Sequence, residues 1–388
     1  MNTAHSSHDM WGPATIAVRG GVDPETGDGL SPAIELSSTF VLAGDPAPGL
    51  PSYARAGSPA YTPLERALAE LEGGADAVAF NAGNAAAAAL FEEATPGSAL
   101  VMPEDAYFGI RVYAQDYLSR HGIEVRLVNT QDLGALDRAL AGASFLWAET
   151  PTNPLLAVSD LRAIGEIAAR RSVPWACDNT FATPILQRPL DLGATASMHS
   201  VTKYIAGHSD LIMGAVVCRD AELAARLRAR RNSFGTQPDG FSCWLARRGM
   251  QTLPLRVRRQ SESALALASR AQHHPSVARV YYPGLPDDPG HEIARGQMNG
   301  GFGGILSLLV HGGADAAQAV VDACRLWVPA TSLGGVESLI ERRARWTGET
   351  ADPALLRLSV GLEEVEDLWR DLECALSGVR RSAFGVRR

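Results

Sequence analysis

Lysine is almost absent from this sequence, and its single lysine is a candidate for amine chemistry. Lysine and arginine together number 35, and Lys203 is the one lysine among them. Codon bias can replace surface lysines by arginines at little physical cost, so the scarcity has an ordinary explanation. Arginine cannot serve where a reaction needs a neutral amine, because its pKa stays above about 12. Lys203 is therefore the place to look for amine chemistry.

Two acidic residues and Lys203 follow short apolar runs that have the length of strands. Glu149 ends FLWAE, Asp178 ends VPWACD, and Lys203 lies in ASMHSVTKY, shortly after the apolar stretch near 194–198. In an open parallel sheet, ligands bind beyond the carboxyl ends of the strands. We therefore expect these three groups to meet at one edge of a sheet, although they are far apart in the sequence.

A lysine and a carboxylate at such an edge suit pyridoxal phosphate (PLP). This cofactor forms an imine with a lysine amine, and it needs a carboxylate against its pyridine nitrogen to keep that nitrogen protonated. Lys203 would supply the amine, and Asp178 would supply the carboxylate. The AGNA segment at 82–85 opens an alanine-rich helix, whose backbone N–H groups and dipole suit a phosphate.

Further donors and a flat ring are also present. Ser200 and Thr202 place hydroxyls beside Lys203, and the ring of Tyr107, just after another predicted strand, would cover the cofactor. Each feature alone has a plainer interpretation, as a turn residue, a helix cap, a packing glycine or a core tyrosine. The combination, in this order and on this pattern of strands and helices, favours the PLP interpretation.

Apolar runs alternate with helix-like stretches over the first part of the chain. The runs lie at 77–80, 98–102, 123–128, 144–148, 173–177 and 211–218. The helix-like stretches lie at 84–94, 107–120, 134–141 and 159–171. This alternation predicts the α/β class, with a mostly parallel sheet and helices on both of its faces.

Three segments follow from these patterns. Residues 1–50, which are rich in Gly, Pro, Ser and Thr, are expected to form an extended N-terminal arm. Residues 51–248 form the predicted PLP-binding α/β domain, and residues 249–388 a smaller C-terminal α/β domain. The C-terminal prediction depends on a second series of strands and helices, at 304–310, 314–326, 355–360 and 363–377.

Composition excludes several classes of partner. The net charge is −8 and no basic stripe occurs, so we expect no nucleic-acid partner. The apolar runs are far shorter than the ~20 residues of a membrane helix, and the first dozen residues lack a secretory signal. The five cysteines are scattered without a C-x-x-C pair, so we expect neither a metal site nor a disulfide framework. A cytoplasmic protein fits these features.

Long motifs carry a resemblance to a known family. They are DPETG (23–27), LSSTF (36–40), ALAELEGG (67–74), ETPTNPLL (149–156), DNTFATPILQRPLDLGA (178–194), HSVTKYIAGHSD (199–210), YYPGLPDDPGHEIA (281–294), SLGGVESLIE (332–341) and RLSVGLEEVEDL (357–368). The sequence resembles the PLP-dependent enzymes of Cys/Met metabolism (the transsulfuration enzymes), closest to the cystathionine γ-lyase and γ-synthase type. The resemblance implies PLP-dependent transferase fold type I and a homotetramer, a dimer of dimers whose active sites are shared between subunits.

The same resemblance implies a role for each matching position. Lys203 would bear the cofactor, Asp178 would pair with its ring nitrogen, and Tyr107 would stack on its ring. The remaining cofactor contacts would come from Asn153 at the phenolic oxygen and, at the phosphate, from Gly83, Asn84, Ser200 and Thr202, with Tyr53 and Arg55 of a neighbouring subunit. The implied substrate-binding residues are Arg357, which would hold the substrate carboxylate, with Ser332 and Thr331 nearby.

The sequence departs from the family pattern at informative positions. Asn84 stands where the family commonly has Met, and Thr331 stands where many γ-acting members have Glu and β-lyases have Tyr. The segment ERRARWTGET at 341–350 replaces the more familiar HPASMTH. The last two features resemble cystathionine γ-lyase-type sequences of high-GC bacteria.

The expected activity is that of a PLP-dependent carbon–sulfur lyase. It would cleave cystathionine by γ-elimination to cysteine, 2-oxobutyrate and ammonia. Two alternatives use the same site, namely γ-replacement on an O-acyl-homoserine, which is a transferase reaction, and β-elimination. A third alternative is a PLP-binding protein without catalysis, against which the joint presence of Lys203, Asp178, Tyr107 and Arg357 argues.

Overall fold

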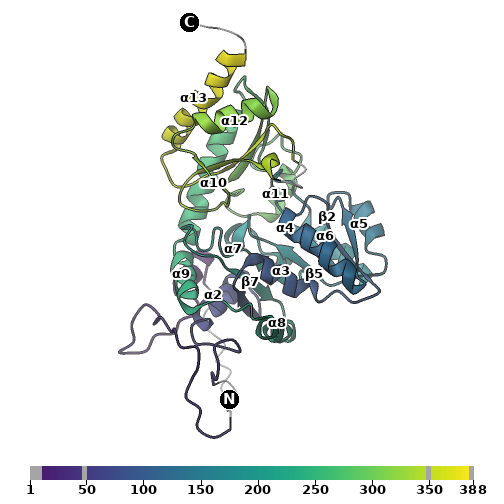
Figure 1. The fold of residues 1–388 in the computed structure, drawn as a ribbon, viewed down its shortest axis with the longest axis vertical. Coiled ribbons are helices and arrows are strands. Elements are labelled where there is room, and N and C mark those ends of the chain that lie inside the picture. The colour runs from purple at the N-terminus through teal and green to yellow at the C-terminus, as the bar shows by residue number, and fades with distance from the viewer. Residues whose placement is uncertain (1–10, 46–49, 347–350, 384–388) are drawn as a thin grey trace.

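Two β-sheets, each covered by helices, organise the chain (Figure 1). The computed structural model describes residues 11–45, 50–346 and 351–383. The first ten residues of the predicted arm and residues 347–350 of the segment ERRARWTGET therefore lie outside the described residues. The α/β class expected from the sequence is confirmed.

The first sheet has seven strands in the order β1-β7-β6-β5-β4-β2-β3. Their bounds are β1 (Asp76–Phe80), β2 (Ala99–Pro103), β3 (Glu124–Val128), β4 (Ala143–Glu149), β5 (Trp175–Asp178), β6 (Ala196–His199) and β7 (Gly214–Cys218). β7 is antiparallel to both of its neighbours, and the other pairs are parallel. Every residue of β2, β5, β6 and β7 is buried, as expected for apolar strands covered on both faces.

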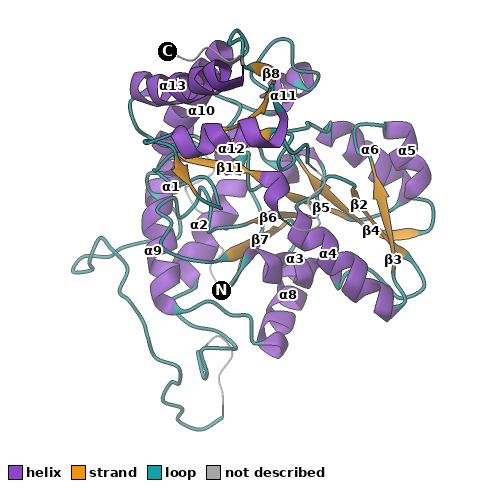
Figure 2. Cartoon of the chain, turned by 45° about the horizontal axis from the view of Figure 1, so that its top comes forward, coloured by secondary structure: helices purple, strands orange, loops and turns teal. Residues whose placement is uncertain are grey.

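Helices cover both faces of this sheet. They are α2 (Thr62–Glu72), α3 (Gly83–Phe91), α4 (Phe108–Tyr117), α5 (Leu133–Ala139), α6 (Leu161–Arg171), α7 (Thr183–Leu186), α8 (Ala221–Phe234) and α9 (Gly240–Met250). Along β1, Ala77 and Ala79 belong to the core that includes α2 and α6, whereas Val78 and Phe80 belong to the core that includes α3, α4 and α8 (Figure 2). This alternation is the period-2 pattern of a strand with two buried faces.

The second sheet has five strands in the order β10-β11-β12-β9-β8. Their bounds are β8 (Val277–Tyr281), β9 (Ile305–Val310), β10 (Val328–Pro329), β11 (Leu339–Arg342) and β12 (Leu355–Ser359). Apolar residues of α10 (Leu253–Ala271), α12 (Gly313–Ala323) and α13 (Val365–Ala383) share one core with it. The predicted domain division near residue 248 falls inside α9, and it stays a prediction.

Several elements differ from the sequence-based expectation. The expected extended arm contains the short helix α1 (Pro13–Arg19). Its seven residues bury only Ile16 and Ala17, so its sequence shows no clear helical period of apolar residues. Helices α9 and α10 are separate, because α10 begins after residue 252 with a proline in its first turn. The elements β8, β10, β11 and α11 (His291–Gln297) were not expected.

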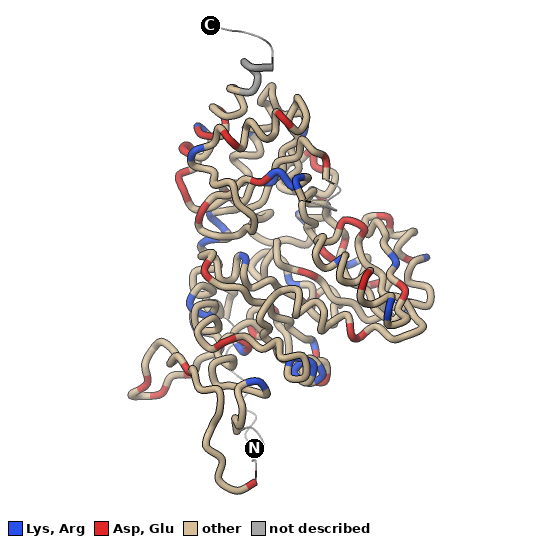
Figure 3. Tube along the Cα trace, in the orientation of Figure 1, with Lys and Arg blue, Asp and Glu red and all other residues tan. Residues whose placement is uncertain are grey.

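Surface charge is mixed over the described chain. Acidic and basic residues are interspersed around both sheets (Figure 3). Within the described ranges, no helix has the length and apolarity needed to cross a membrane.

Candidate active site

The carboxyl ends of β4, β5 and β6 meet at one edge of the large sheet, as expected. Glu149 pairs in register with Asp178, and Asp178 pairs with Met198. Lys203 lies in the turn after β6. A cavity of about 720 Å³ opens at this edge, and it is also lined by residues from the small sheet's side of the molecule. The predicted site residues that line it are Gly83, Asn84, Tyr107, Asn153, Asp178, Ser200, Thr202, Lys203, Thr331, Ser332 and Arg357.

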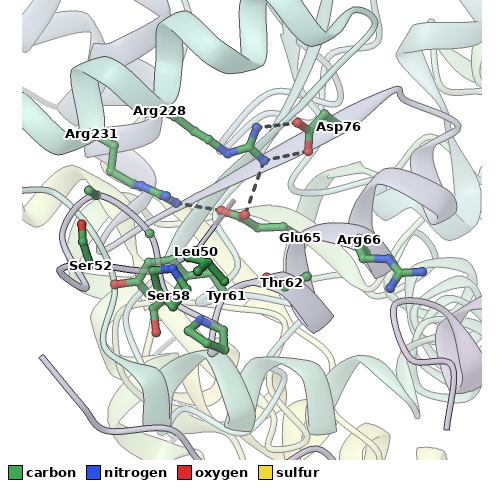
Figure 4. A pocket seen from close by; sticks show the side chains of 14 residues that line it. Leu50, Ser52, Ser58, Tyr61, Thr62, Glu65, Arg66, Asp76, Arg228 and Arg231 are labelled. Atoms are coloured by element: carbon green, nitrogen blue, oxygen red, sulfur yellow. Dashed lines mark hydrogen bonds and ion pairs between the residues drawn. The ribbon is translucent and has the colours of Figure 1, made fainter. Parts of the chain in front are cut away.

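Two predicted site residues lie elsewhere. Tyr53 and Arg55 do not line the Lys203 cavity of their own chain, and both side chains are exposed. Their segment borders a different cavity of about 560 Å³, which is lined by residues 50–52, 56–59, 61, 62, 65 and 66 together with Asp76, Arg228 and Arg231 (Figure 4). The structure of one chain therefore separates these two residues from the others.

The amine of Lys203 is held in a form suited to nucleophilic chemistry. Burial, and after it the positive charge of Arg357, lower the pKa of Lys203 from its ordinary 10.5 to about 8, while Glu341 acts in the opposite sense. The amine donates a hydrogen bond of 2.7 Å to Ser332 Oγ. Ser332 has φ 75°, a left-handed conformation that costs a non-glycine residue about 1–3 kcal/mol. That conformation lets its hydroxyl accept from Lys203 while its carbonyl accepts from Arg357.

Two buried carboxylates, Asp178 and Glu149, face the cavity. Burial raises the pKa of Asp178, although hydrogen bonds from Thr180 and the charge of His199 partly oppose this effect. Burial and the negative charge of Asp178 raise the pKa of Glu149 well above its usual range. Within the described chain, neither carboxylate has an ion-pair partner, so a cationic group placed in the cavity would stabilise both.

Glu149 and Thr180 position the neighbouring segments by hydrogen bonds. Glu149 accepts from the backbone N–H of Tyr107 (2.8 Å) and of Asn153 (3.3 Å). The backbone N–H of Thr180 donates to Asp178 Oδ1 at 3.0 Å, and its Oγ1 accepts from the backbone N–H of Ser200 at 2.8 Å. These bonds connect four loops to the edge of the sheet.

The N-terminus of α3 forms another wall of the cavity. No side chain among the described residues caps this helix at Ala82, so its first N–H groups are directed to whatever occupies the cavity. A Cβ added at Gly83 would lie 3.1 Å from Ser200 Oγ, so a side chain there would occupy the space between the start of α3 and Ser200. The hydroxyl of Thr202 both donates to and accepts from the backbone of Met213. An uncapped helix start next to a serine hydroxyl fits a phosphate group.

Arg357 lies on β12 with its side chain nearly buried, on the wall opposite the carboxylates. Its Nη1 donates to Asn153 Oδ1 at 3.0 Å, and its Nη2 donates to Ser332 O at 2.8 Å and to Glu341 Oε2 at 2.7 Å. These contacts hold the guanidinium in the cavity wall, where a cation suits the carboxylate of a bound molecule.

Sequence reasoning missed four residues of this site: Thr180, Glu341, Arg343 and Trp346. Glu341 is 1% exposed and connects Arg357 to Trp346, whose Nε1 donates to Glu341 Oε1 at 2.7 Å. Arg343 and Trp346 line the cavity directly. The available signal was the unusual segment ERRARWTGET, but its pattern does not show which side chains turn inward.

The residues lining the cavity fit PLP as a resident cofactor. Lys203 offers an amine of lowered pKa, Asp178 offers a carboxylate that forms no ion pair among the described residues, and the start of α3 offers phosphate donors. The exposed side chain of Tyr107 lines the same cavity.

Comparison with known proteins assigns the family. Residues 14–377 match the family described as Cys/Met metabolism PLP-dependent enzyme. The chain is 44% identical to a cystathionine gamma-synthase of Mycobacterium tuberculosis over 378 residues, which cover 94% of this chain and 97% of the relative. It is 38% identical to a cystathionine gamma-lyase of Dictyostelium discoideum, over 91% of this chain and 94% of the relative.

A solved structure agrees with these matches. Cystathionine gamma synthase from Xanthomonas oryzae pv. oryzae, solved in complex with cystathionine, superposes with a TM-score of 0.92 at 40% identity, covering 96% of this chain and 99% of that chain. Relatives with different named reactions thus match over nearly the same length. The chain belongs to the Cys/Met metabolism family of PLP-dependent enzymes.

Proposed function

We propose that this protein is a PLP-dependent carbon–sulfur lyase that cleaves cystathionine by γ-elimination. Cystathionine and water would give cysteine, 2-oxobutyrate and ammonia. The observation that carries the proposal is the Lys203 amine, whose pKa is lowered to about 8 in a cavity that also contains Asp178 and Arg357. When bound, PLP would supply an aldehyde for this amine and a ring that stabilises negative charge at the substrate Cα.

Each residue of the site would have a defined task. Lys203 Nζ, whose pKa is lowered to about 8, would bind the cofactor and would then accept the Cα proton of the substrate. Asp178 would keep a proton on the cofactor ring nitrogen, because that positive charge relieves its unpaired burial. Tyr107 would cover the ring, and Asn153 would lie near the phenolic oxygen while orienting Arg357.

The remaining residues would bind the phosphate of the cofactor and the α-carboxylate of the substrate. Gly83 and Asn84 at the start of α3, with Ser200 and Thr202, would bind the phosphate. Arg357 would bind the substrate α-carboxylate, with Ser332 and Thr331 beside it. Ser332 Oγ, which already accepts from Lys203 Nζ, would orient the amine during proton transfer.

A second candidate reaction is γ-replacement on an O-acyl-homoserine with cysteine, which forms cystathionine instead of cleaving it. It is supported by the 44% identity to a protein named cystathionine gamma-synthase. The two reactions would share Lys203, Asp178 and Arg357, since both begin by removing the Cα proton.

A product assay separates these reactions. The purified protein, reconstituted with PLP, would be incubated with cystathionine, homocysteine, methionine and an O-acyl-homoserine, with and without cysteine, and the products analysed by mass spectrometry. We expect 2-oxobutyrate and cysteine from cystathionine. Pyruvate and homocysteine would indicate β-elimination, and cystathionine formed only from the acyl-homoserine with cysteine would indicate γ-replacement. No product from any substrate would contradict the proposed function.

A second copy of the chain is proposed to complete the site. Tyr53 and Arg55 are exposed and lie outside their own Lys203 cavity, and the neighbouring arm exposes the apolar side chains of Leu30, Leu36 and Val41, which a partner would cover. We expect a homotetramer in which each subunit lends Tyr53 and Arg55 to the phosphate of another. Mixing inactive Arg55→Ala and Lys203→Ala subunits should then restore activity, because hybrid dimers contain one intact site; failure of complementation would exclude a shared site.

A further inference from the structure

Arg343 brings a second guanidinium group into the Lys203 cavity. Its side chain lines the cavity and is 9% exposed overall. Glu341 Oε2 accepts from Arg343 Nη1 at 3.2 Å and from Arg357 Nη2 at 2.7 Å. Because both nitrogens contact the same oxygen, they lie within about 6 Å of each other. One buried carboxylate therefore orients two arginines along the same wall.

Exposure increases in order along this wall. Arg357 is 3% exposed, Arg343 is 9% exposed, and Trp346 is 46% exposed. All three line the cavity, and Arg343 is intermediate in exposure between the deep guanidinium and the partly exposed indole. A substrate whose α-carboxylate is bound by Arg357 would extend its chain past Arg343 toward the exposed end.

Charge in the cavity is divided between its two sides. The carboxylates that line it, Glu149 and Asp178, come from the large-sheet edge, at least among the described residues. The opposite wall is formed by Thr331, Ser332, Leu333, Arg343, Trp346 and Arg357. This wall presents two guanidinium groups that share the Glu341 carboxylate, together with hydroxyls and apolar surface, so a guanidinium there can bind an anionic group at the far end of the substrate.

We propose that Arg343 binds a second, distal carboxylate of the substrate and thereby selects amino acids that carry an acidic group at the far end of the side chain. Trp346 would pack against the methylene and sulfur atoms between the two ends. The indole is held for this purpose by Glu341 Oε1, at 2.7 Å from Nε1. The inference rests on the proposed function, because it takes Arg357 as the site of the α-carboxylate.

The test compares Arg343→Met with Arg345→Met. Arg345 also pairs with Glu341, at 3.5 Å, but it does not line the cavity, so it controls for loss of a cation near that carboxylate. We expect Arg343→Met to raise KM for cystathionine by roughly tenfold to a hundredfold, the range of a charge-assisted hydrogen bond. Turnover of homocysteine, which has no distal carboxylate, should change less than about twofold, and Arg343→Lys should recover part of the loss.

A binding experiment tests the same residue without turnover. L-2-Aminosuberate carries a distal carboxylate and L-2-aminooctanoate does not, although both have the same chain length. The PLP-loaded wild-type protein should bind the dicarboxylate more tightly in a spectroscopic titration, and Arg343→Met should lose this preference. Equal weakening of both ligands, no effect on either, or the same effect from Arg345→Met would overturn the inference. If the wild-type protein forms no product from any substrate, the proposed function fails, whereas the titration still decides the role of Arg343.

Discussion

Two cavities of similar size lie in this molecule, and they differ in how their charges are paired. The cavity beneath residues 50–66 measures about 560 Å³, and the Lys203 cavity measures about 720 Å³. In the smaller one, Arg231 binds Glu65 at 2.7 Å, and Arg228 binds Asp76 through two nitrogens (Figure 4). These arginines and carboxylates neutralise each other, so little charge is left for a ligand.

The Lys203 cavity differs, because the two carboxylates that line it form no ion pair among the described residues. Asp178 and Glu149 lie on one side without a cation in the described chain, and burial raises the pKa of both. Lys203 has a lowered pKa, and Arg357 is held on the opposite wall by Glu341. The comparison shows that volume and the number of charged residues do not identify an active site. What identifies it is buried charge that only a bound molecule would neutralise.

Replacing Lys203 should have the largest effect. Lys203→Ala removes both the amine that would bind PLP and the base that would accept the Cα proton, so kcat should fall by about 10⁴-fold or more. The visible absorbance of the lysine-bound cofactor should also disappear, as absorption spectroscopy after reconstitution would show. Lys203→Arg keeps a positive charge and serves as the control, and it should be equally inactive. Multiple turnovers by either variant would contradict the assignment.

Replacing Asp178 should have the next largest effect. Asp178→Asn keeps the shape and removes the charge that would hold a proton on the cofactor ring, so we expect kcat to fall about 10²- to 10³-fold. Asp178→Glu, which keeps the charge, should retain more activity. Both variants should still bind PLP through Lys203, which the absorption spectrum would report. A kcat for Asp178→Asn close to that of the wild type would exclude the proposed role.

The smaller cavity should respond in stability and not in chemistry. Arg231→Met leaves Glu65 buried beside a partly exposed Arg228, and loss of one partner of a buried ion pair costs about 3–5 kcal/mol. Urea unfolding should show this loss, while the folded fraction keeps its cofactor absorbance. The double variant Arg231→Met with Glu65→Gln should be more stable than the single variant. If Arg231→Met had the unfolding midpoint of the wild type, or if its folded fraction lost cofactor binding, the smaller cavity would not have the purely structural role assigned to it.

The pH dependence of the rate of cofactor binding should show the smallest of these effects. Because the pKa of Lys203 is lowered to about 8, its amine becomes neutral as the pH rises through that value. The rate at which the cofactor-free protein binds PLP should therefore rise with pH and level off above about 8. Arg357→Leu removes a positive charge near the amine, so the midpoint should move to higher pH. Stopped-flow absorbance over a pH series measures both curves, and a midpoint that stays near 10.5 in the wild type would refute the lowered pKa.

Much of the large sheet could be predicted because its signals are local. Strands buried on both faces are continuous apolar runs, and parallel strands bring their carboxyl ends together, so Glu149, Asp178 and Lys203 could be assigned to one edge before the fold was known. The motifs around Lys203 and Arg357 also indicated the family that the comparisons show. Short elements were missed because α1 buries only Ile16 and Ala17, and β10 has only two residues.

The sequence by itself determined the alternation of strands and helices and the residue types available for PLP chemistry, since both depend on neighbours in the chain. Tertiary structure alone decided which of these side chains share a cavity. Arg357 meets Asn153 across 204 residues, and Lys203 meets Ser332 across 129. Such contacts depend on how one sheet packs against the other, and packing of distant segments leaves no local period to read. The same reason explains why Glu341 and Arg343 became visible as site residues only in the folded chain.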